Sequence, residues 1–287
     1  MKIGFIGLGA MGRHMAARLE AAGHALQTFD LNGKGNRKSA REASQGVEVL
    51  FTSLPGPTEV ESVFKELDFS SVQAWFDTST NSPDVVRRIC SKLSCLMDSP
   101  VSGGPKGAES GKLAIWVGGD ETLFKNYEFL LKQIGDQPFY VGPIGAGTVA
   151  KLAHNTASFI IQAALAEVMT LGVKAGVEPL ALFKAIRQGA AGRKRTFDRL
   201  PEHFLSGKYD PPAFTLRLAH KDLTLALDLA KQEKVPMKIA ELAHRDFTEA
   251  MQRGWEGRDC RVAMTLQEER AGVSVRVPAE RLQNVLD

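Results

Sequence analysis

The stretch Gly4-Phe5-Ile6-Gly7-Leu8-Gly9-Ala10-Met11-Gly12 decides the fold of the first half of this chain. It begins inside an apolar run, Ile3–Ile6, which has the length of one buried strand. Behind it, apolar side chains recur at every fourth residue, at Met11, Met15 and Leu19, which predicts a helix. The sequence therefore predicts a strand, a tight glycine turn and a helix in immediate succession.

Glycines stand at the three positions where such a turn needs them. Gly7 permits the tight turn, Gly9 lets the backbone approach a pyrophosphate, and Gly12 lets the helix pack closely on the strand. The first helical turn also offers free N–H groups and the positive end of the helix dipole. A merely structural turn is the alternative, but the strand–turn–helix context favours a nicotinamide dinucleotide. The predicted binding residues are Gly7, Leu8, Gly9, Ala10, Met11 and Gly12.

A carboxylate follows the second predicted strand. Ala25–Phe29 is apolar and leads directly into Asp30. A carboxylate at this place accepts hydrogen bonds from both ribose hydroxyls and repels a 2′-phosphate, which favours NAD. The alternative is a solvated aspartate that begins a turn. Lys34, Arg37 and Lys38 follow closely and could hold a 2′-phosphate, so NADP remains possible.

Short apolar runs alternate with amphipathic stretches through the first half of the chain. The predicted strands are Ile3–Ile6, Ala25–Phe29, Val47–Leu54, Ala74–Phe76 and Leu96–Met97. They are too uniformly apolar to face water on one side, as is typical of buried parallel strands. Ser82-Pro83 opens a further helix. This alternation predicts an α/β, Rossmann-type doubly wound parallel sheet over residues 1–146.

The pattern changes near Gly145-Ala146-Gly147, and almost no strand signal follows. We predict one long helix from Thr148 to about Ala175 and another from Pro179. Two more are expected over Leu218–Lys231 and Ile239–Met251. Residues 147–287 are therefore predicted to be an all-helical substrate and dimerisation domain that begins with a long inter-domain helix.

The composition excludes several classes of protein. The 287 residues are 44% hydrophobic and 24% charged, which is ordinary for a globular protein. The formal net charge of +3 is too small to argue for a nucleic-acid or membrane partner. The N-terminus enters a strand without a signal-peptide core, and Phe159–Val173 is too short to span a bilayer. We interpret that segment as buried in a helical core.

The three cysteines, Cys90, Cys95 and Cys260, form no Cys-x-x-Cys pair and have no suitable histidine beside them. The sequence therefore predicts neither a zinc site nor a disulfide framework. A reducing compartment, the cytoplasm, is the expected location.

Three further motifs follow the glycine turn in a fixed order. They are Asp98-Ser99-Pro100-Val101-Ser102-Gly103-Gly104, then Gly145-x-Gly147-x-x-x-Lys151-x-x-His154-Asn155, then Phe214 with Lys221-Asp222-Leu223. Together with the glycine turn, this order resembles the β-hydroxyacid dehydrogenase family, which includes 3-hydroxyisobutyrate dehydrogenases and tartronate semialdehyde reductases. The motifs extend from residue 7 to residue 223, and four in order are far more specific than one.

The resemblance implies a role for each matching residue. Lys151 corresponds to the catalytic lysine. The substrate would be bound by Ser102, Gly103, Gly104 and Asn155. Besides the glycine turn and Asp30, the cofactor would be contacted by Leu54, Pro55, Ser79, Thr80 and Lys221.

The same chemistry can be argued from the residues alone. Oxidising an alcohol removes a hydride, which a nicotinamide accepts, and a proton, which needs a base. Lys151 and Asn155 are four residues apart on a predicted helix and so share one face. Burial on an apolar helix favours the neutral form of a lysine, although Lys151 could instead only snorkel to solvent. We interpret His154 as structural and expect it on another face of the helix.

The chain departs from the family pattern in two places. His154 stands where many relatives have asparagine. The segment from Asp30 to Ser39 is about ten residues shorter than usual, so a helix is missing beside the adenine pocket. A separate basic run, Arg193-Lys194-Arg195, is either a solvated turn or a site for a second acidic group of the substrate.

The sequence therefore predicts an oxidoreductase that transfers a hydride between NAD(P) and a small 3-hydroxy acid. Candidate substrates are 3-hydroxyisobutyrate, L-serine, and glycerate with tartronate semialdehyde. The alternatives are an imine reductase-like enzyme and a non-catalytic NAD(P)-binding member, but relatives of both kinds tend to lack the lysine. A homodimer or homotetramer is expected, with the long helix as a plausible interface.

Overall fold

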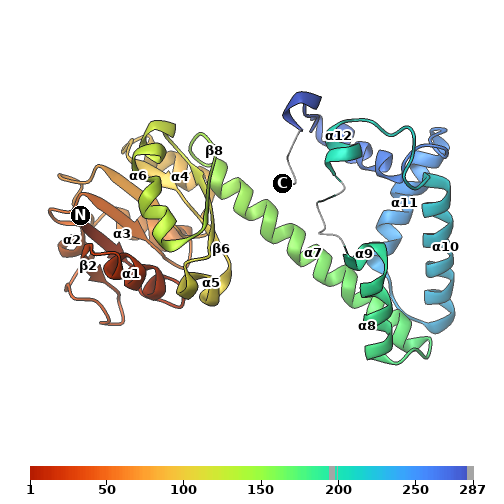
Figure 1. Cartoon of the computed structure of the whole chain (residues 1–287), viewed down its shortest axis with the longest axis horizontal. Coiled ribbons are helices and arrows are strands. Elements are labelled where there is room, and N and C mark those ends of the chain that lie inside the picture. Colours follow the sequence, from red (N-terminus) through yellow and green to blue (C-terminus); the bar gives the residue numbers. More distant parts are fainter. Residues whose placement is uncertain (194–197, 199, 283–287) are drawn as a thin grey trace. The chain divides into compact units, whose positions relative to one another are not determined.

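The computed structural model describes residues 1–193, 198 and 200–282. The chain forms two compact units, Met1–Ala157 and Ser158–Asp287, which are described in turn. The first is the predicted Rossmann-type α/β domain, and the second is helical (Figure 1). Residues 147–157, which the sequence analysis assigns to the helical domain, belong to the first unit.

Eight strands form one mixed sheet in the first unit, all of whose residues are described. They are β1 (Lys2–Ile6), β2 (Ala25–Phe29), β3 (Val49–Thr52), β4 (Ala74–Asp77), β5 (Leu96–Asp98), β6 (Val101–Ser102), β7 (Ala114–Gly118) and β8 (Gln137–Gly142). Their order is β2-β1-β3-β4-β5-β7-β6, with β8 on β7. The five predicted strands are parallel neighbours, as expected. The unpredicted β7 runs antiparallel to β5 and β6, which makes the sheet mixed.

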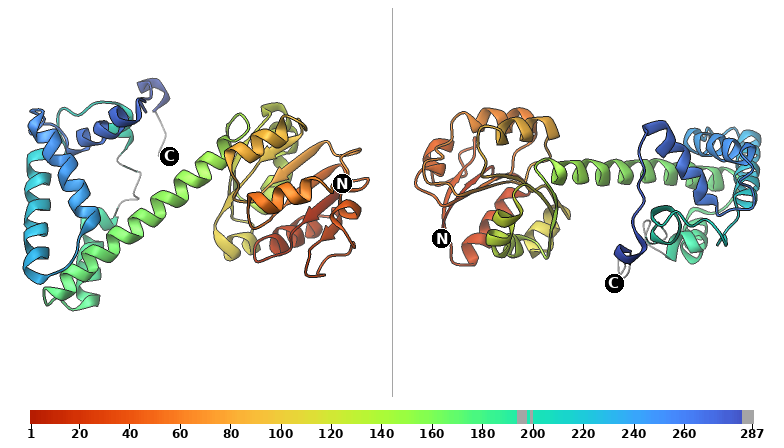
Figure 2. Two further views of the ribbon diagram at one scale, coloured as in Figure 1. Left: turned by 180° about the vertical axis from the view of Figure 1, so that it is seen from behind. Right: turned by 90° about the horizontal axis from the view of Figure 1, so that it is seen from above.

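Helices cover both faces of this sheet (Figure 2). One face is packed by α1 (Gly12–Ala21), α5 (Gly104–Ser110) and α6 (Glu121–Ile134), the other by α2 (Ala40–Ser44), α3 (Pro57–Phe64) and α4 (Pro83–Cys90). Alternate residues of one strand serve the two layers, so that Phe76 belongs to the first core and Trp75 to the second. Because both faces are buried, the central strands β1, β3 and β4 are largely apolar.

The segment after Asp30 folds back along the edge strand β2. The Thr28 N–H donates to Asn36 Oδ1 at 2.8 Å, Asn36 Nδ2 donates to the Leu26 carbonyl at 3.0 Å, and the Arg37 N–H donates to the Thr28 carbonyl at 3.0 Å. No helix forms between residues 30 and 39, and the helix that follows, α2, has five residues.

The second unit is built from helices around two small buried clusters. The helices are the C-terminal part of α7 (Ala146–Lys174), α8 (Pro179–Gln188), α9 (Ala190–Arg193), α10 (Leu216–Glu233), α11 (Lys238–Gln252) and α12 (Thr265–Ala271). Short helical turns lie at Pro201–Leu205, Cys260–Met264 and Ala279–Arg281. The four predicted helices correspond to α7, α8, α10 and α11.

The long helix α7 corrects the prediction that Phe159–Val173 is buried. Phe159 is 64% exposed and Ile160 54%. The helix has 29 residues and a window of mean hydropathy 1.5, so it is long and apolar enough to cross a membrane by length and composition only. It also makes polar contacts with the chain: the Glu167 carboxylate accepts hydrogen bonds from the N–H groups of Ile239 and Ala240 at the start of α11, at 2.9 and 3.3 Å.

Candidate active site

The glycine turn between β1 and α1 has the geometry that its sequence predicts. Gly7 adopts a positive φ of 96°, and a Cβ atom there would overlap the Ser53 carbonyl. A Cβ on Gly12 would overlap the Gly7 carbonyl, whereas nothing lies within 4 Å of a Cβ on Gly9. Two glycines are therefore required by close packing, and Gly9 presents open backbone on which a phosphate fits.

A cavity of about 470 Å³ extends from this turn. It is lined by the glycine turn, by Asp30, Leu31 and Asn32 after β2, by Ser53, Leu54 and Pro55 after β3, and by polar and apolar side chains of α3 and the residues just after it. The Asp30 carboxylate accepts hydrogen bonds from the N–H groups of Leu8, at 2.7 Å, and Asn32, at 2.8 Å. The Asn32 N–H in particular lowers the pKa of Asp30, which holds this group as a carboxylate.

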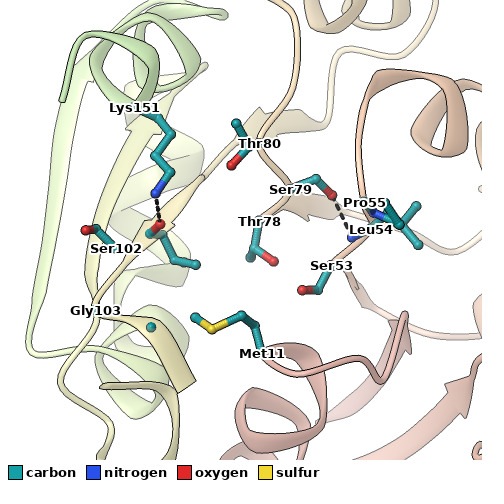
Figure 3. Close-up of a pocket in the computed structure, with 12 residues that line it drawn as sticks. Met11, Ser53, Leu54, Pro55, Thr78, Ser79, Thr80, Ser102, Gly103 and Lys151 are labelled. Carbon is teal, nitrogen blue, oxygen red and sulfur yellow. Dashed lines mark hydrogen bonds between the residues drawn. The ribbon is translucent and has the colours of Figure 1, made fainter. Parts of the chain in front are cut away.

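A second cavity, of about 300 Å³, lies at the ends of β3, β4 and β6 (Figure 3). Its lining residues are Met11, Ser53, Leu54, Pro55, Thr78, Ser79, Thr80, Val101, Ser102, Gly103, Gly104 and Lys151. The structure thus brings together nine of the residues predicted from sequence, and adds Ser53, Thr78 and Val101. Met11, Ser53, Leu54 and Pro55 line both cavities, so the two adjoin and offer room for the two halves of a dinucleotide.

Lys151 reaches this second cavity from α7. Its Nζ donates to the Val101 carbonyl at 2.7 Å (Figure 3). The side chain is half-buried, and this burial lowers the pKa of Lys151 from its ordinary value. A lysine in this state exchanges a proton more readily near neutral pH than an exposed lysine does.

Asp98 fixes the helix that carries Lys151. Its buried carboxylate accepts hydrogen bonds from the N–H groups of Gly145, at 2.8 Å, and Thr148, at 2.6 Å, at the start of α7. Burial raises the pKa of Asp98. The chain that follows Asp98 leads within three residues to Val101, whose carbonyl holds Lys151. Asp98 stands in one of the sequence motifs, but the sequence alone predicts no role for it.

Hydroxyl groups shape the wall that β4 contributes. Ser79 Oγ accepts a hydrogen bond from the Leu54 N–H at 2.9 Å, which joins the two predicted cofactor loops (Figure 3). The buried Asp77 carboxylate accepts from Thr52 Oγ1 and Asn81 Nδ2, both at 2.8 Å. These bonds hold the turn that carries Thr80.

His154 is placed differently from the expectation. It lies three residues after Lys151, which on a helix makes them neighbours, and both contact the ring of Trp116 on β7. The prediction that His154 faces away from Lys151 is therefore wrong. Its Nδ1 donates to Asn155 Oδ1 at 3.1 Å.

Three predicted groups lie outside the two cavities. Asn155 follows Lys151 by one helical turn but does not line either of them. Lys221 lies on α10 in the second unit, where it is exposed and 3.0 Å from the Asp222 carboxylate. Of the basic run, Arg193 ends α9, whereas Lys194 and Arg195 lie outside the described residues.

Comparison with known families gives the class of the protein. Residues 2–142 match the family described as the NAD binding domain of 6-phosphogluconate dehydrogenase. Residues 145–266 match the family described as NAD-binding of NADP-dependent 3-hydroxyisobutyrate dehydrogenase. The glycine turn, the Asp30 carboxylate and the adjoining cavities thus belong to an NAD(P)-dependent dehydrogenase.

Individual relatives narrow this class. The chain is 33% identical to 2-(hydroxymethyl)glutarate dehydrogenase of Eubacterium barkeri, over 96% of this chain and 97% of the relative. It is 33% identical to 3-hydroxyisobutyrate dehydrogenase of Pseudomonas aeruginosa, over 86% of this chain and 91% of the relative. The chain belongs to the β-hydroxyacid dehydrogenase family and is an NAD(P)-dependent enzyme of that family.

Solved structures agree with this assignment. The chain resembles 3-hydroxyisobutyrate dehydrogenase of Mycobacterium tuberculosis with L-serine, with a TM-score of 0.63 and 26% identity, over 93% of this chain and 99% of the other. An imine reductase from Pseudomonas sp. has a TM-score of 0.73 at 19% identity, over 93% of this chain and 99% of the other, which shows a shared fold alone.

Proposed function

We propose that this enzyme transfers a hydride between NAD(P) and a small 3-hydroxy acid, with Lys151 as the general base in oxidation and the general acid in reduction. The observation that carries the proposal is the position of Lys151. Among the residues lining the second cavity it has the one side chain that carries a charge, and its burial favours proton exchange.

The residues of the second cavity would have different roles in such a reaction. The nicotinamide, when bound, accepts or supplies the hydride. Lys151 would take the hydroxyl proton of the alcohol or return it to the carbonyl oxygen. Ser102, Gly103 and Gly104 would bind the carboxylate. Gly103 and Gly104 have positive φ angles of 135° and 63°, a backbone of the kind that forms anion-binding concavities.

The size of the second cavity favours a small substrate, because its 300 Å³ must also hold the nicotinamide. Relatives are named for such compounds: 3-hydroxyisobutyrate dehydrogenase, NAD-dependent L-serine dehydrogenase, and 2-hydroxy-3-oxopropionate reductase. We therefore propose 3-hydroxyisobutyrate, L-serine and glycerate with tartronate semialdehyde as the compounds to assay first.

The test is a substrate panel followed at 340 nm with NAD and NADP, for the wild type and Lys151→Met. A general acid–base contributes roughly 10²- to 10⁴-fold, so kcat of Lys151→Met should fall by that factor while NADH affinity is retained. Full kcat in this variant would remove Lys151 from the mechanism. Binding of NADH without turnover of any hydroxy acid would favour the non-catalytic alternative, and turnover of imines alone would favour the imine reductase.

We propose NAD as the preferred cofactor, because carboxylates line the first cavity and the nearby Arg37 is bound to another side chain. Asp30 lines it as a carboxylate, with Glu59 and Glu66 from α3 and its continuation. Arg37 is engaged elsewhere: its Nε donates to Gln27 Oε1 at 2.8 Å. Asp30→Ala should reduce the preference for NAD over NADP by about tenfold, the value of one lost charge-assisted hydrogen bond. An unchanged ratio would reject Asp30 as the discriminator.

We also propose that the enzyme is a homodimer or homotetramer that covers the apolar surface of α7. Phe159, Ile160 and Leu165 are each at least 50% exposed along this helix. Apolar surface of this kind in an enzyme is usually covered by another chain. Asn155 and Lys221 remain proposed ligands of substrate and cofactor.

A further inference from the structure

We propose that Trp116 is a positioning residue for the pair Lys151 and Asn155: its indole contacts Lys151 directly and reaches Asn155 through His154. The inference rests on the proposed role of Lys151 in proton transfer. No motif in the sequence marks Trp116, and it does not line either cavity.

The first arm of this arrangement joins Trp116 to Lys151. The Lys151 ammonium lies 5.9 Å from the centre of the indole, within the range of a cation–π interaction. The backbone N–H of Trp116 donates to the Pro100 carbonyl at 3.1 Å. The next residue, Val101, accepts the hydrogen bond of Lys151, so the backbones of Trp116 and of this acceptor belong to one hydrogen-bonded pair of strands.

The second arm joins Trp116 to Asn155. The rings of Trp116 and His154 have centroids 5.0 Å apart and planes inclined by 46°. His154 Nδ1 lies 3.1 Å from Asn155 Oδ1. An amide oxygen only accepts, so the imidazole carries its proton on Nδ1 and donates it. The indole thus limits the freedom of the imidazole that orients the amide.

These contacts leave N–H donors of Lys151 and Asn155 free to bind a substrate. In its ammonium form, the general acid of the reduction, Lys151 has three N–H donors and uses one of them on Val101. Since His154 occupies the Asn155 oxygen, the two Asn155 Nδ2 protons remain available. Both residues therefore present donors, which suits the oxygen atoms of a hydroxy acid. A lysine side chain loses much rotational freedom when it is ordered, so a prior contact with Trp116 lowers that cost in the reactive complex.

The kinetic test compares Trp116→Leu with Trp116→Phe. Loss of the aromatic face should lower kcat roughly two- to fivefold, the fold-change that corresponds to a cation–π contact, with the KM for NAD unchanged. Trp116→Phe should restore most of kcat because it keeps an aromatic face. Phe139→Leu is the matched control, since Phe139 is the cross-strand partner of Trp116 on β8 and is 64% exposed.

The second arm has a separate prediction. His154→Ala should raise the KM for the hydroxy acid more than it lowers kcat, because it frees the Asn155 amide. The effects of Trp116→Leu and His154→Ala should be less than additive, since one change already releases the other contact. Additive effects, or a lowered affinity for NAD in Trp116→Leu, would reject the positioning role.

A measurement without substrate separates this inference from the proposed function. With lysine labelled with ¹³C at Cε, the Lys151 signal is assigned by its loss in Lys151→Arg. The indole ring current should shift it away from the exposed lysines, and Trp116→Leu should return it toward them. If the shift is present but no hydroxy acid is oxidised, the proposed function fails and the contact stands. If the shift is absent, the positioning role is wrong whatever the activity.

Discussion

The α/β unit buries most of its large apolar side chains against its own elements, whereas the helical unit leaves many of its own exposed. In the first unit Phe5, Phe51 and Phe76 lie stacked under α1 and α6 with no exposed surface. Along α7 and α8, Phe159 and Phe183 are 64% and 48% exposed. The first unit therefore has a core of its own, and the exposed apolar surface of the second agrees with the proposed oligomer.

The largest expected effect tests the second half of this comparison. Replacing Phe159 and Ile160 with serine on α7 should dissociate the proposed oligomer, because each apolar side chain buried at an interface contributes roughly 2 kcal/mol. Sedimentation velocity would show the wild type as a dimer or tetramer and the variant as a monomer. Phe129→Ser, at a 47% exposed position of α6, is the control that should leave the mass unchanged. A monomeric wild type would contradict the comparison itself.

Asp98→Ala should produce the next largest effect, and it should act on the α/β unit. The change removes two hydrogen bonds to a buried carboxylate and leaves two N–H groups of α7 without their acceptor. The free energy of unfolding should fall by about 3 kcal/mol. Urea denaturation measures this loss, and hydrogen exchange should locate it at β5 and the start of α7. Asp120→Ala, which removes the N-terminal cap of α6, should cost about 1 kcal/mol.

Glu167→Ala should have a smaller effect, confined to the helical unit. It removes the carboxylate that accepts the Ile239 and Ala240 N–H groups, a loss of about 1 kcal/mol. Hydrogen exchange should increase at the start of α11 and stay unchanged in the sheet. Gln162→Ala on the same helix is the comparison. Equal changes in both units would show that they unfold together.

The smallest effect concerns Lys151 itself. Because burial lowers its pKa in the folded state, the unfolded chain binds more protons at pH values between the folded pKa and 10.5. Wild-type stability should rise with pH through that window. The stability of the wild type relative to Lys151→Met should therefore increase as the pH rises through this window. Thermal unfolding at pH 7 and pH 10 measures it, with the exposed Lys112→Met as control.

The strands and glycine turn of the α/β unit could be predicted because their pattern is local. Ala25–Phe29 and the turn at Gly7 were predicted with the bounds or contacts observed. The strand Val101–Ser102 has two residues, and Gln137–Gly142 contains a proline and polar residues, so neither shows an apolar run. Their pairing with β7 depends on contacts between distant residues, which no local pattern records.

The candidate site likewise contains residues that could be predicted from the sequence and residues that could not. Ser102, Gly103, Gly104 and Lys151 could be assigned from motifs, and they line one cavity. Trp116 could not, because its contact with Lys151 depends on where β7 lies beside α7. The apolar composition of α7 likewise indicated that its surface packs against other protein, but not whether that protein is the same chain or another one.

The segment after Asp30, which folds back along β2, has a consequence for the solubility of the protein. An edge strand with free N–H and carbonyl groups is a template on which further chains add as strands, the first step of aggregation. Asn36 fills these positions with its own amide, and Arg37 adds a backbone bond to Thr28. The segment after Asp30 thus closes this edge of the sheet to intermolecular pairing. The Asn36 side chain protects the β2 edge from pairing with another chain. Asn36→Ala should therefore aggregate more readily than the wild type.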